Sequence, residues 1–335
     1  MIRVAVDAMG GDNAPTTEVE GVARALRELA PTFAVDIVGP TAAIETELAK
    51  HPTIDRTRIG VVEAAEVIGM ADKPLEAVRK KRKSSIVVGL GLQASGVTQA
   101  FVSAGNTGAM LAASTLLLGL HPGVERASVG TLLPTAEGPV LMLDAGANLD
   151  CSARELLGFA YLGSIYVRDI LDRPSPAVGL LNVGEEEGKG TKLIKAAHLL
   201  LKESPRLNYL GNIEGRDILA GHQRLGRVDV VVCDGFVGNI VLKFYESVMG
   251  LVRHLAAEEG LWDRPETRKA FRMLDYSQYG GAPLLGVKGN SIICHGASNA
   301  NAILNAIRVA VQAVDHNLSQ HIGAEFATHQ AVGPA

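Results

Sequence analysis

Short apolar runs alternate with helical patterns along most of the chain. The runs are typical of strands and lie at residues 4–7, 34–38, 58–62, 99–103, 129–133, 140–144, 177–182, 207–210, 228–234 and 291–295. Helical patterns lie between most of them, at residues 16–29, 42–50, 75–93, 107–118, 153–171, 191–202 and 299–320. This alternation predicts a three-layer α/β fold, with helices on both faces of a mainly parallel sheet. Such sheets bind ligands at the carboxyl ends of their strands.

The rhythm changes between residues 238 and 279, where no strand pattern occurs. Helical patterns at 240–259 and 265–276 predict two consecutive helices, joined near Gly260 and Trp262. The sequence has no linker rich in Ser or Pro, no low-complexity tract and no evident repeat. We therefore expect a single α/β domain over residues 1–335, with a protruding helical hairpin at 240–279.

Composition excludes several classes of protein. Hydrophobic residues make up 47% of the chain, enough for a large core, and a net charge of −4 gives no reason to expect nucleic acid as a partner. The three cysteines lack CxxC spacing, so we expect neither a disulfide framework nor a bound metal. The first residues read as a strand and not as a signal peptide, and no run approaches the roughly 20 apolar residues of a membrane span. We expect a protein of the cytoplasm.

Glycine, asparagine and aspartate recur where the predicted strands end. They fill four stretches, at residues 103–108, 144–148, 211–215 and 234–239. Gly and Asn allow backbone conformations that turn several N–H groups toward one point, and a helix that begins there adds its own free N–H groups. Such a site suits an anion. We therefore expect a phosphate-sized oxyanion site at the carboxyl ends of the strands.

The first of these loops is the strongest candidate, because it follows a strand and opens an apolar helix. Five of its residues are expected to hold phosphate: Ser103, Gly105, Asn106, Thr107 and Gly108. A purely structural turn is the other interpretation of the same pattern. The loop from Asp7 to Asp12 has a similar form, and turn chemistry alone also explains its glycines.

Standard nucleotide-binding motifs are missing. Residues 184–191 resemble a P-loop, but the spacing is one residue short and three Glu side chains would repel phosphates. Gly89 and Gly91 do not continue as GxGxxG, and they lie in a helical pattern. We therefore expect neither ATP nor a nicotinamide, and no other cofactor. The motifs GxSxG and HExxH are absent too, so covalent catalysis has no obvious nucleophile.

Two further patterns bear on partners. Five consecutive cations lie in one predicted helix: Arg79, Lys80, Lys81, Arg82 and Lys83. They are either a solvated surface or a docking patch for an acidic protein. An apolar stripe in the predicted hairpin includes Leu251, Leu255, Leu261 and Trp262. It suits a dimer interface or an anionic membrane; we favour the dimer, and the two are compatible.

The order of these motifs resembles the bacterial phosphate acyltransferase family PlsX. The resemblance rests on motifs at residues 7–12, 103–109, 144–148, 179–190, 211–215, 234–239 and 279–296, and it covers residues 4 to 314. One departure is Ser247, where the family pattern leads us to expect Gly; it falls in a predicted helix, away from the loops. The family's fold is similar to those of isocitrate dehydrogenase and phosphotransacetylase, so the resemblance implies a Rossmann-like sheet of that kind.

The resemblance implies transfer of a fatty acyl group from the thioester of acyl carrier protein to inorganic phosphate, giving acyl phosphate for phospholipid synthesis. It also implies a homodimer, loosely attached to the inner face of the cell membrane, which would supply a downstream membrane glycerol-3-phosphate acyltransferase. One rival is a phosphotransacetylase-like enzyme that uses small coenzyme A thioesters. Another is a metal- and nicotinamide-dependent dehydrogenase, for which we find neither the metal-binding Asp residues nor an arginine-rich acid pocket. A third is a noncatalytic, membrane-bound scaffold for acyl carrier protein.

The chemistry of this reaction suits the residues. Phosphate is an anion at neutral pH and the leaving thiolate has a parent pKa of about 8.5, so neither a strong base nor a strong acid is required. We expect Lys189 and Asn239 to be catalytic, stabilising phosphate or the oxyanion that develops on the thioester carbonyl. Other polar residues would orient these donors or line the site: Asp7, Asp12, Asp144, Asn148, Asn182, Glu214, Asp234 and His295. The acyl chain needs an apolar channel, walled by the helix after residue 107 or by those after Val241.

Overall fold

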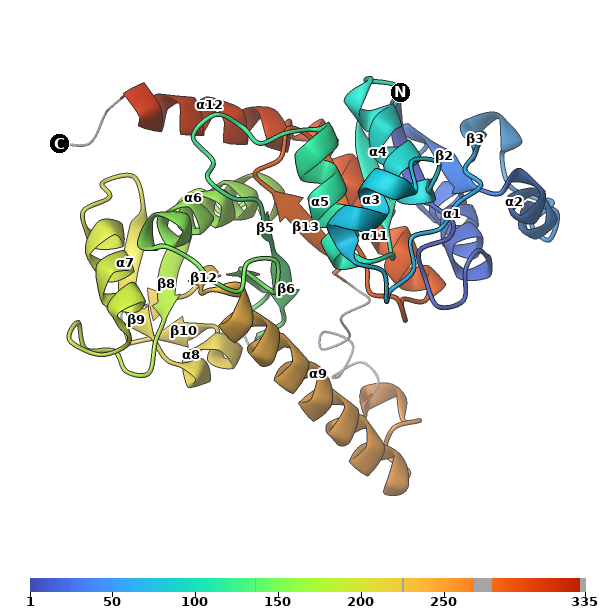
Figure 1. Ribbon diagram of the computed structural model, residues 1–335. Helices are drawn as coiled ribbons and strands as arrows, with labels where there is room; N and C mark the ends of the chain where they lie inside the picture. Colours follow the sequence, from blue (N-terminus) through green and yellow to red (C-terminus); the bar gives the residue numbers. More distant parts are fainter. Residues whose placement is uncertain (136, 225, 268–278, 332–335) are drawn as a thin grey trace. The chain divides into compact units, whose positions relative to one another are not determined.

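The chain forms two compact units, which are described separately. A computed structural model describes residues 1–135, 137–224, 226–267 and 279–331. The first unit comprises Met1–Ala127 and Tyr279–Ala335, and the second Ser128–Gln278. In both, helices flank a sheet (Figure 1). The prediction of one continuous domain over residues 1–335 stays a prediction.

The first unit contains a mainly parallel sheet. Its elements are β1 (Ile2–Asp7), α1 (Thr16–Glu28), β2 (Phe33–Gly39), α2 (Thr41–Leu48), a 3₁₀ turn (Arg56–Arg58), β3 (Ile59–Glu63), α3 (Pro74–Lys80), α4 (Ser85–Ala94), β4 (Ala100–Ser103), α5 (Thr107–Leu117), β13 (Ala282–Leu285), β14 (Asn290–Ile293), α11 (Ala300–Asp315) and α12 (Leu318–Ala331). The strand order is β3-β2-β1-β4-β14-β13, and within it only the β13–β14 pair is antiparallel. The carboxyl ends of β1, β4 and β14 therefore lie side by side at one edge.

Both faces of this sheet are buried, as its Val- and Ile-rich strands predict. On one face, Val4 and Val6 of β1 join α1 and α11 in a continuous core. On the other face, Phe101 of β4 packs directly on Gly89 of α4, where a built Cβ would stand 2.2 Å from the Phe101 ring. Gly89 thus allows the close packing of α4 on β4.

The second unit has a five-stranded sheet. Its elements are β5 (Ser128–Val129), β6 (Thr131–Leu133), β7 (Val140–Leu143), α6 (Ala153–Ile170), β8 (Ala177–Leu181), α7 (Lys192–Lys202), β9 (Asn208–Ile213), α8 (Gly215–Ala220), β10 (His222–Gln223), β11 (Gly226–Arg227), β12 (Val230–Val232) and α9 (Gly235–Glu258). The order is β6-β7-β12-β8-β9, with β6 antiparallel and the other four parallel. These two sheets confirm the predicted fold class.

The predicted helix over residues 75–93 is wrong, because α3 ends at Lys80 and α4 begins at Ser85. Lys81 leaves the helical region at φ −94° and ψ 66°. Its ammonium donates to Val67 O at 2.8 Å and to Asp72 Oδ2 at 2.6 Å. The Lys83 N–H donates to Glu66 Oε2 at 2.8 Å. Bonds to a distant segment thus replace the helical ones at this point.

Two other predicted elements are also divided. The helix predicted over 299–320 is split at Asn317, which has a φ of 52°, into α11 and α12. The strand predicted over 129–133 is split at Gly130 into β5 and β6. Three short strands, β10, β11 and β13, and the helix α8 were not expected from the sequence.

The helix α9 begins at Gly235, earlier than the predicted residue 240, because Asp234 caps it. By length and composition alone its 24 residues could cross a membrane, contrary to the expectation that no run approaches a span; only 17% of its most apolar window is buried. Most of the second predicted hairpin helix, at 265–276, lies outside the described residues.

Candidate active site

The carboxyl ends of β1 and β4 are joined by a buried hydrogen bond. Ser103 Oγ donates to Asp7 Oδ2 at 2.7 Å and accepts the Gly105 N–H at 3.0 Å. Asp7 Oδ1 accepts the Met9 N–H at 2.9 Å. Burial raises the pKa of Asp7, while the bonds from Ser103 and Met9 lower it. Both side chains are therefore occupied in fixing the two loops.

Asn106 fixes the start of α5. Its Oδ1 accepts the Ala109 N–H at 3.0 Å, which makes it the N-cap. Its Nδ2 lies 3.2 Å from Gly69 O and 3.1 Å from Met70 O, so the same amide anchors a neighbouring loop. Since both ends of the amide have protein partners, Asn106 shapes the loop, and its predicted contact with phosphate stays a prediction.

The exposed part of this loop is the first turn of α5. Thr107 is exposed and Gly108 is partly exposed. The first intrahelical bond is from Met110 N–H to Asn106 O, so the N–H groups of Thr107 and Gly108 precede the helical ladder. Together with the positive end of the helix dipole, they form an arrangement that attracts an anion.

The loop from Met9 to Asp12 packs against the same region. A Cβ built on Gly10 would lie 2.5 Å from Gly105 N, so only glycine allows this approach. Asp12 N–H donates to Gly296 O at 2.8 Å, which ties the loop to the residues after β14. Asp12 and His295 are exposed, and His295 Nδ1 accepts the Ala297 N–H at 3.2 Å. Three adjacent strand ends thus contribute to one edge of the first unit.

In the second unit, Asp144 organises the loop after β7. It is fully buried. Its Oδ1 accepts the Val129 N–H at 2.9 Å and the Ser128 hydroxyl at 3.2 Å. Its Oδ2 accepts the N–H of Asn148 at 2.6 Å and Asn148 Nδ2 at 3.1 Å. Burial raises the pKa of Asp144, and these bonds oppose the rise.

The start of α9 lies against this loop. Asp234 Oδ1 accepts the Val237 N–H at 2.8 Å. A Cβ on Gly238 would lie 1.9 Å from Asp144 O, so the helix backbone touches the loop directly. One turn of helix places the exposed Asn239 beside Gly146, where a built Cβ would be 3.4 Å from Asn239 Cβ. The structure thus brings together Asp144, Asn148 and Asn239.

Lys189 lies in the loop after β8. Asn182 Nδ2 donates to Lys189 O at 3.3 Å, and the Lys189 N–H donates to Glu186 O at 3.0 Å. The side chain of Lys189 is exposed, and no ion pair is recorded for it among the described residues.

Two of the three Glu side chains that precede Lys189 have other partners. Glu185 pairs with Arg216 at 3.3 Å, and Glu187 pairs with Lys202. Glu214 caps α8 together with Asp217. The exposed ammonium of Lys189 can therefore meet an anion in spite of its acidic neighbours.

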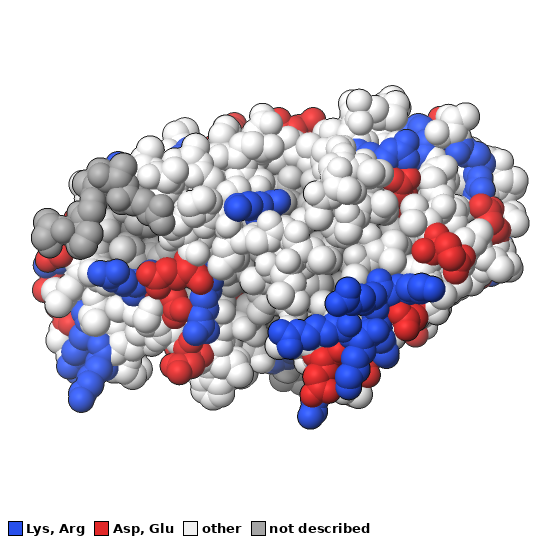
Figure 2. All heavy atoms as spheres, turned by 45° about the horizontal axis from the view of Figure 1, so that its top comes forward, with Lys and Arg blue, Asp and Glu red and all other residues white. Residues whose placement is uncertain are grey.

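The basic run is exposed except at one position. Arg79, Lys80, Arg82 and Lys83 are exposed, whereas Lys81 is half-buried by its bond to Asp72. On the face shown in Figure 2, Lys and Arg side chains gather in a cluster with acidic side chains beside it. The run is therefore a surface feature of the first unit, available to a partner.

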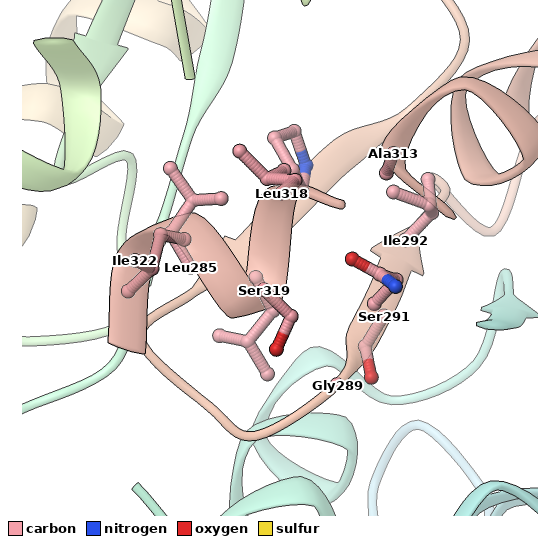
Figure 3. A pocket seen from close by; sticks show the side chains of 11 residues that line it. Leu285, Gly289, Ser291, Ile292, Ala313, Leu318, Ser319 and Ile322 are labelled. Atoms are coloured by element: carbon pink, nitrogen blue, oxygen red, sulfur yellow. The ribbon is translucent and has the colours of Figure 1, made fainter. Parts of the chain in front are cut away.

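A small cavity lies apart from these loops, where α12 packs on β13 and β14 (Figure 3). Leu318, Ser319 and Ile322 of α12 line it together with Ser291 and Ile292 of β14. Its volume of about 10 Å³ admits no more than one water molecule. It is too small for phosphate or an acyl chain.

Known proteins place the chain in a family. The family model described as "fatty acid synthesis protein" matches residues 2–321. A phosphate acyltransferase from Heliobacterium modesticaldum is 47% identical in an alignment that covers 96% of this chain and 98% of that protein. The chain belongs to the PlsX phosphate acyltransferase family. Another member, the phosphate acyltransferase of Desulforamulus reducens, is 45% identical over 95% of both chains.

Solved structures of low sequence identity share the fold of this PlsX family member. A phosphotransacetylase from Streptococcus pyogenes has a TM-score of 0.62 at 19% identity, with 94% of each chain covered. A branched-chain phosphotransacylase from Enterococcus faecalis has a TM-score of 0.59 at 13% identity, covering 94% of this chain and all of that one. The predicted phosphotransacetylase-like fold is confirmed.

The predicted site residues fall into two groups, according to whether their side chains have structural hydrogen bonds or are exposed. Asp7, Asp144, Asp234 and Glu214 hold loops or cap helices, whereas Thr107, Lys189 and Asn239 are exposed. Their roles in catalysis stay predictions. Among the described residues, no group of three or more His, Cys, Asp or Glu side chains could hold a metal ion. Sequence reasoning missed Glu18, a buried acid beneath Gly11.

Proposed function

We propose that this protein transfers a fatty acyl group from the thioester of acyl carrier protein to inorganic phosphate. The observation that carries the proposal is the first turn of α5, where a network of buried polar groups fixes an accessible turn whose first N–H groups precede the helical ladder, at the end of a parallel strand. This arrangement suits a phosphate oxyanion. Membership of a family whose relatives are phosphate acyltransferases supports the same reaction.

The reaction needs positioning more than proton transfer. A phosphate oxygen attacks the thioester carbonyl carbon, a C–O bond forms, the C–S bond breaks, and the carrier leaves as a thiolate that takes up a proton. Because phosphate is already anionic, the enzyme must mainly hold it in line and stabilise the negative charge on the carbonyl oxygen.

Each group of residues supplies one part of this chemistry. The N–H groups of Thr107 and Gly108, with the Thr107 hydroxyl, would bind phosphate. Lys189 and Asn239 would stabilise phosphate or the oxyanion, since both are exposed polar donors, Lys189 in a loop bonded by Asn182 and Asn239 in the first turns of α9. Asp7, Asp144 and Asp234 would act indirectly, because their carboxylates bond the loops that carry these donors.

The exposed basic run Arg79–Lys83 is proposed to dock the acidic acyl carrier protein. Opposite charge accelerates encounter and orients the partner. The run lies at the end of α3 and just after it. Pro74, at the start of α3, contacts the first turn of α5, because a Cβ built on Gly108 would lie 2.6 Å from Pro74 Cγ. A carrier bound here would hold its thioester close to the proposed phosphate site.

We also propose that the enzyme is a cytoplasmic homodimer that attaches to the inner face of the membrane and delivers acyl phosphate to a membrane glycerol-3-phosphate acyltransferase. Support for membrane contact comes from α9. Its exposed side chains Phe236, Ile240, Phe244, Leu251 and Leu255 recur at helical spacing on one stripe. Such a stripe is suited to the surface of a bilayer.

The decisive experiment mixes the purified protein with palmitoyl acyl carrier protein and radiolabelled phosphate. Hydroxylamine-sensitive acyl phosphate is the expected product. If the folded protein binds the carrier but forms none, the reaction is excluded in favour of the scaffold. A parallel assay with acetyl coenzyme A tests the alternative suggested by the phosphotransacetylase neighbours: greater activity with this small thioester would replace the proposed substrate.

A further inference from the structure

Glu18 is a buried acid beneath the loop that follows β1. It lies in the first turn of α1 and is 1% exposed. Neither carboxyl oxygen has a hydrogen-bond partner among the described residues. A carboxyl group that is buried without partners is costly, so its position requires a physical explanation.

The carboxyl of Glu18 occupies the space that a side chain at position 11 would need. A Cβ built on Gly11 would lie 2.2 Å from Glu18 Oε1. The next residue, Asp12, donates its N–H to Gly296 O at 2.8 Å. The residue before, Gly10, packs on Gly105 of the proposed phosphate loop. Glu18 therefore supports the turn that links these two neighbouring loops.

The groups that face Glu18 favour its neutral form. Asp7 from β1 and Asp12 from the turn add negative charge, and Cys294 faces it from the end of β14. On the same helix, at Gly21, α1 packs closely against the Ile303 side chain and the Ala300 carbonyl of α11. Burial is the largest cause that raises the pKa of Glu18, to about 7. The N–H groups of Glu18 and Gly11 lie near enough to oppose the rise, although neither forms a hydrogen bond of good geometry with the carboxyl.

Acids on the other elements that pack against α1 are paired elsewhere. Asp36 of β2 bonds Arg3, and Glu47 of α2 bonds Lys50. Because Asp36 and Glu47 are paired with these basic residues, neither forms a hydrogen bond with Glu18.

We propose that Glu18 is a positioning residue for phosphate binding: its neutral carboxyl supports the turn Met9–Asp12, and its ionisation places a negative charge beneath that turn and weakens binding of the anion. This inference rests on the proposed function only in taking phosphate as the ligand. Beyond that function, we infer that the affinity for phosphate depends on pH through Glu18, a residue that acts through the turn and not by contact with the reacting atoms.

The test compares Glu18→Gln, which is neutral at every pH and similar in shape, with the wild type. KM for phosphate and kcat are measured from pH 6 to 8.5. Phosphate itself changes charge in this range, so the quantity of interest is the ratio of the wild-type KM to the variant KM. We expect this ratio to rise on the order of tenfold with pH, as for one added charge at short range, while the kcat ratio changes little.

Matched variants distinguish this role from a merely structural one. Glu20→Gln, at an exposed position on the same helix, should leave the ratio flat. Glu18→Leu is a second neutral variant, for use if Glu18→Gln folds poorly, and the ratio of the wild-type KM to its KM should rise with pH in the same way. A KM ratio that is constant with pH in an active, folded variant would overturn the proposal.

A binding measurement separates this inference from the proposed function. The rise in melting temperature caused by inorganic phosphate is measured at pH 6 and pH 8.5 without thioester. We expect the rise to be similar in wild type and Glu18→Gln at pH 6, and larger in the variant at pH 8.5. If the wild type forms no acyl phosphate but this difference is found, the reaction fails and the role of Glu18 stands. If wild type and Glu18→Gln show the same rise in melting temperature at pH 6 and also at pH 8.5, Glu18 has no such role, whether or not the protein forms acyl phosphate.

Discussion

At the scale of single residues, the acids at the strand ends hold loops and leave other groups free for chemistry. Asp7 and Asp144 together accept hydrogen bonds from two hydroxyls, three backbone N–H groups and one side-chain amide, all at or below 3.2 Å. Lys189, by contrast, is exposed in a loop whose backbone is bonded by Asn182. A polar residue with no structural duty is the better candidate for a direct role in catalysis.

The first prediction concerns Lys189. Lys189→Ala should lower kcat for acyl phosphate formation by roughly two to three orders of magnitude, as for the loss of a main donor to the transition state. The melting temperature should change little, because the side chain is exposed. Lys195→Ala, at an exposed position on α7, is the matched control. A near-wild-type rate for Lys189→Ala would remove this residue from the mechanism.

A second prediction follows from the buried carboxyl of Glu18. Its pKa is about 7 in the folded state against 4.5 when unperturbed, so between these values the folded protein holds the proton more tightly than the unfolded chain. The contribution of Glu18 to the free energy of unfolding is therefore greatest below pH 4.5 and falls as the pH rises toward 7. Relative to the wild type, Glu18→Gln should gain up to about 3 kcal/mol between pH 4.5 and 8. Urea unfolding at both pH values measures this gain, and a constant difference would contradict it.

At the scale of elements, the contact between α9 and the Asp144 loop depends on glycine. A Cβ on Gly238 would lie 1.9 Å from Asp144 O, a backbone atom that cannot move aside alone. Gly250 lies on the same helix with nothing within 4 Å of its built Cβ. The two positions therefore separate close packing from helix propensity.

Gly238→Ala should destabilise the protein by about 1–3 kcal/mol through overpacking, and should also lower activity by displacing Asn239. Gly250→Ala should stabilise it by up to about 1 kcal/mol, because alanine is the better helix former. Thermal unfolding of the two variants measures both effects. If the two substitutions have the same effect on stability, the close approach at Gly238 is not a constraint.

How well an element could be predicted depends on how locally it is determined. Most strands of the two sheets, rich in Val and Ile, and the start of α5 after Asn106 were predicted correctly because their signals are local, whereas β13 was missed. The break between α3 and α4 was missed, because Lys81 is drawn out of the helix by Val67 and Asp72, which no local pattern reveals.

The burial of single side chains was equally hard to predict from the sequence. An acid in the first turn of a helix usually lies at the surface and favours the helix dipole, so Glu18 gave no signal of its burial. The sequence likewise could not distinguish acids that bond loops from those that would touch a ligand. Hydrogen-bond partners distant in the chain decide that, as Val129 and Asn148 do for Asp144.

At the scale of the whole molecule, the net charge of −4 hides an uneven surface. Four cations of the run 79–83 are exposed on the first unit, although the protein as a whole is acidic. If this run docks the carrier, then Arg79→Glu combined with Lys83→Glu should raise KM for palmitoyl acyl carrier protein several-fold and leave KM for a small thioester nearly unchanged. Added salt should likewise raise the wild-type KM for palmitoyl acyl carrier protein more than the KM for the small thioester. Equal effects on both thioesters would exclude docking at this run.

The final prediction concerns the exposed stripe of α9. Leu251 and Leu255 are 56% and 51% exposed, and elsewhere on the same helix the guanidinium of Arg253 lies 5.3 Å from the centre of the Trp262 ring. An exposed apolar stripe of this kind suits the surface of a bilayer. Leu251→Glu combined with Leu255→Glu should therefore abolish co-sedimentation with vesicles of anionic phospholipid. The activity on soluble acyl carrier protein should not change, and the mass of the protein in solution, measured by light scattering, shows whether the stripe also serves the proposed dimer. If vesicle binding persists while the dimer dissociates, the stripe belongs to the subunit interface, and membrane attachment must be sought elsewhere on the protein.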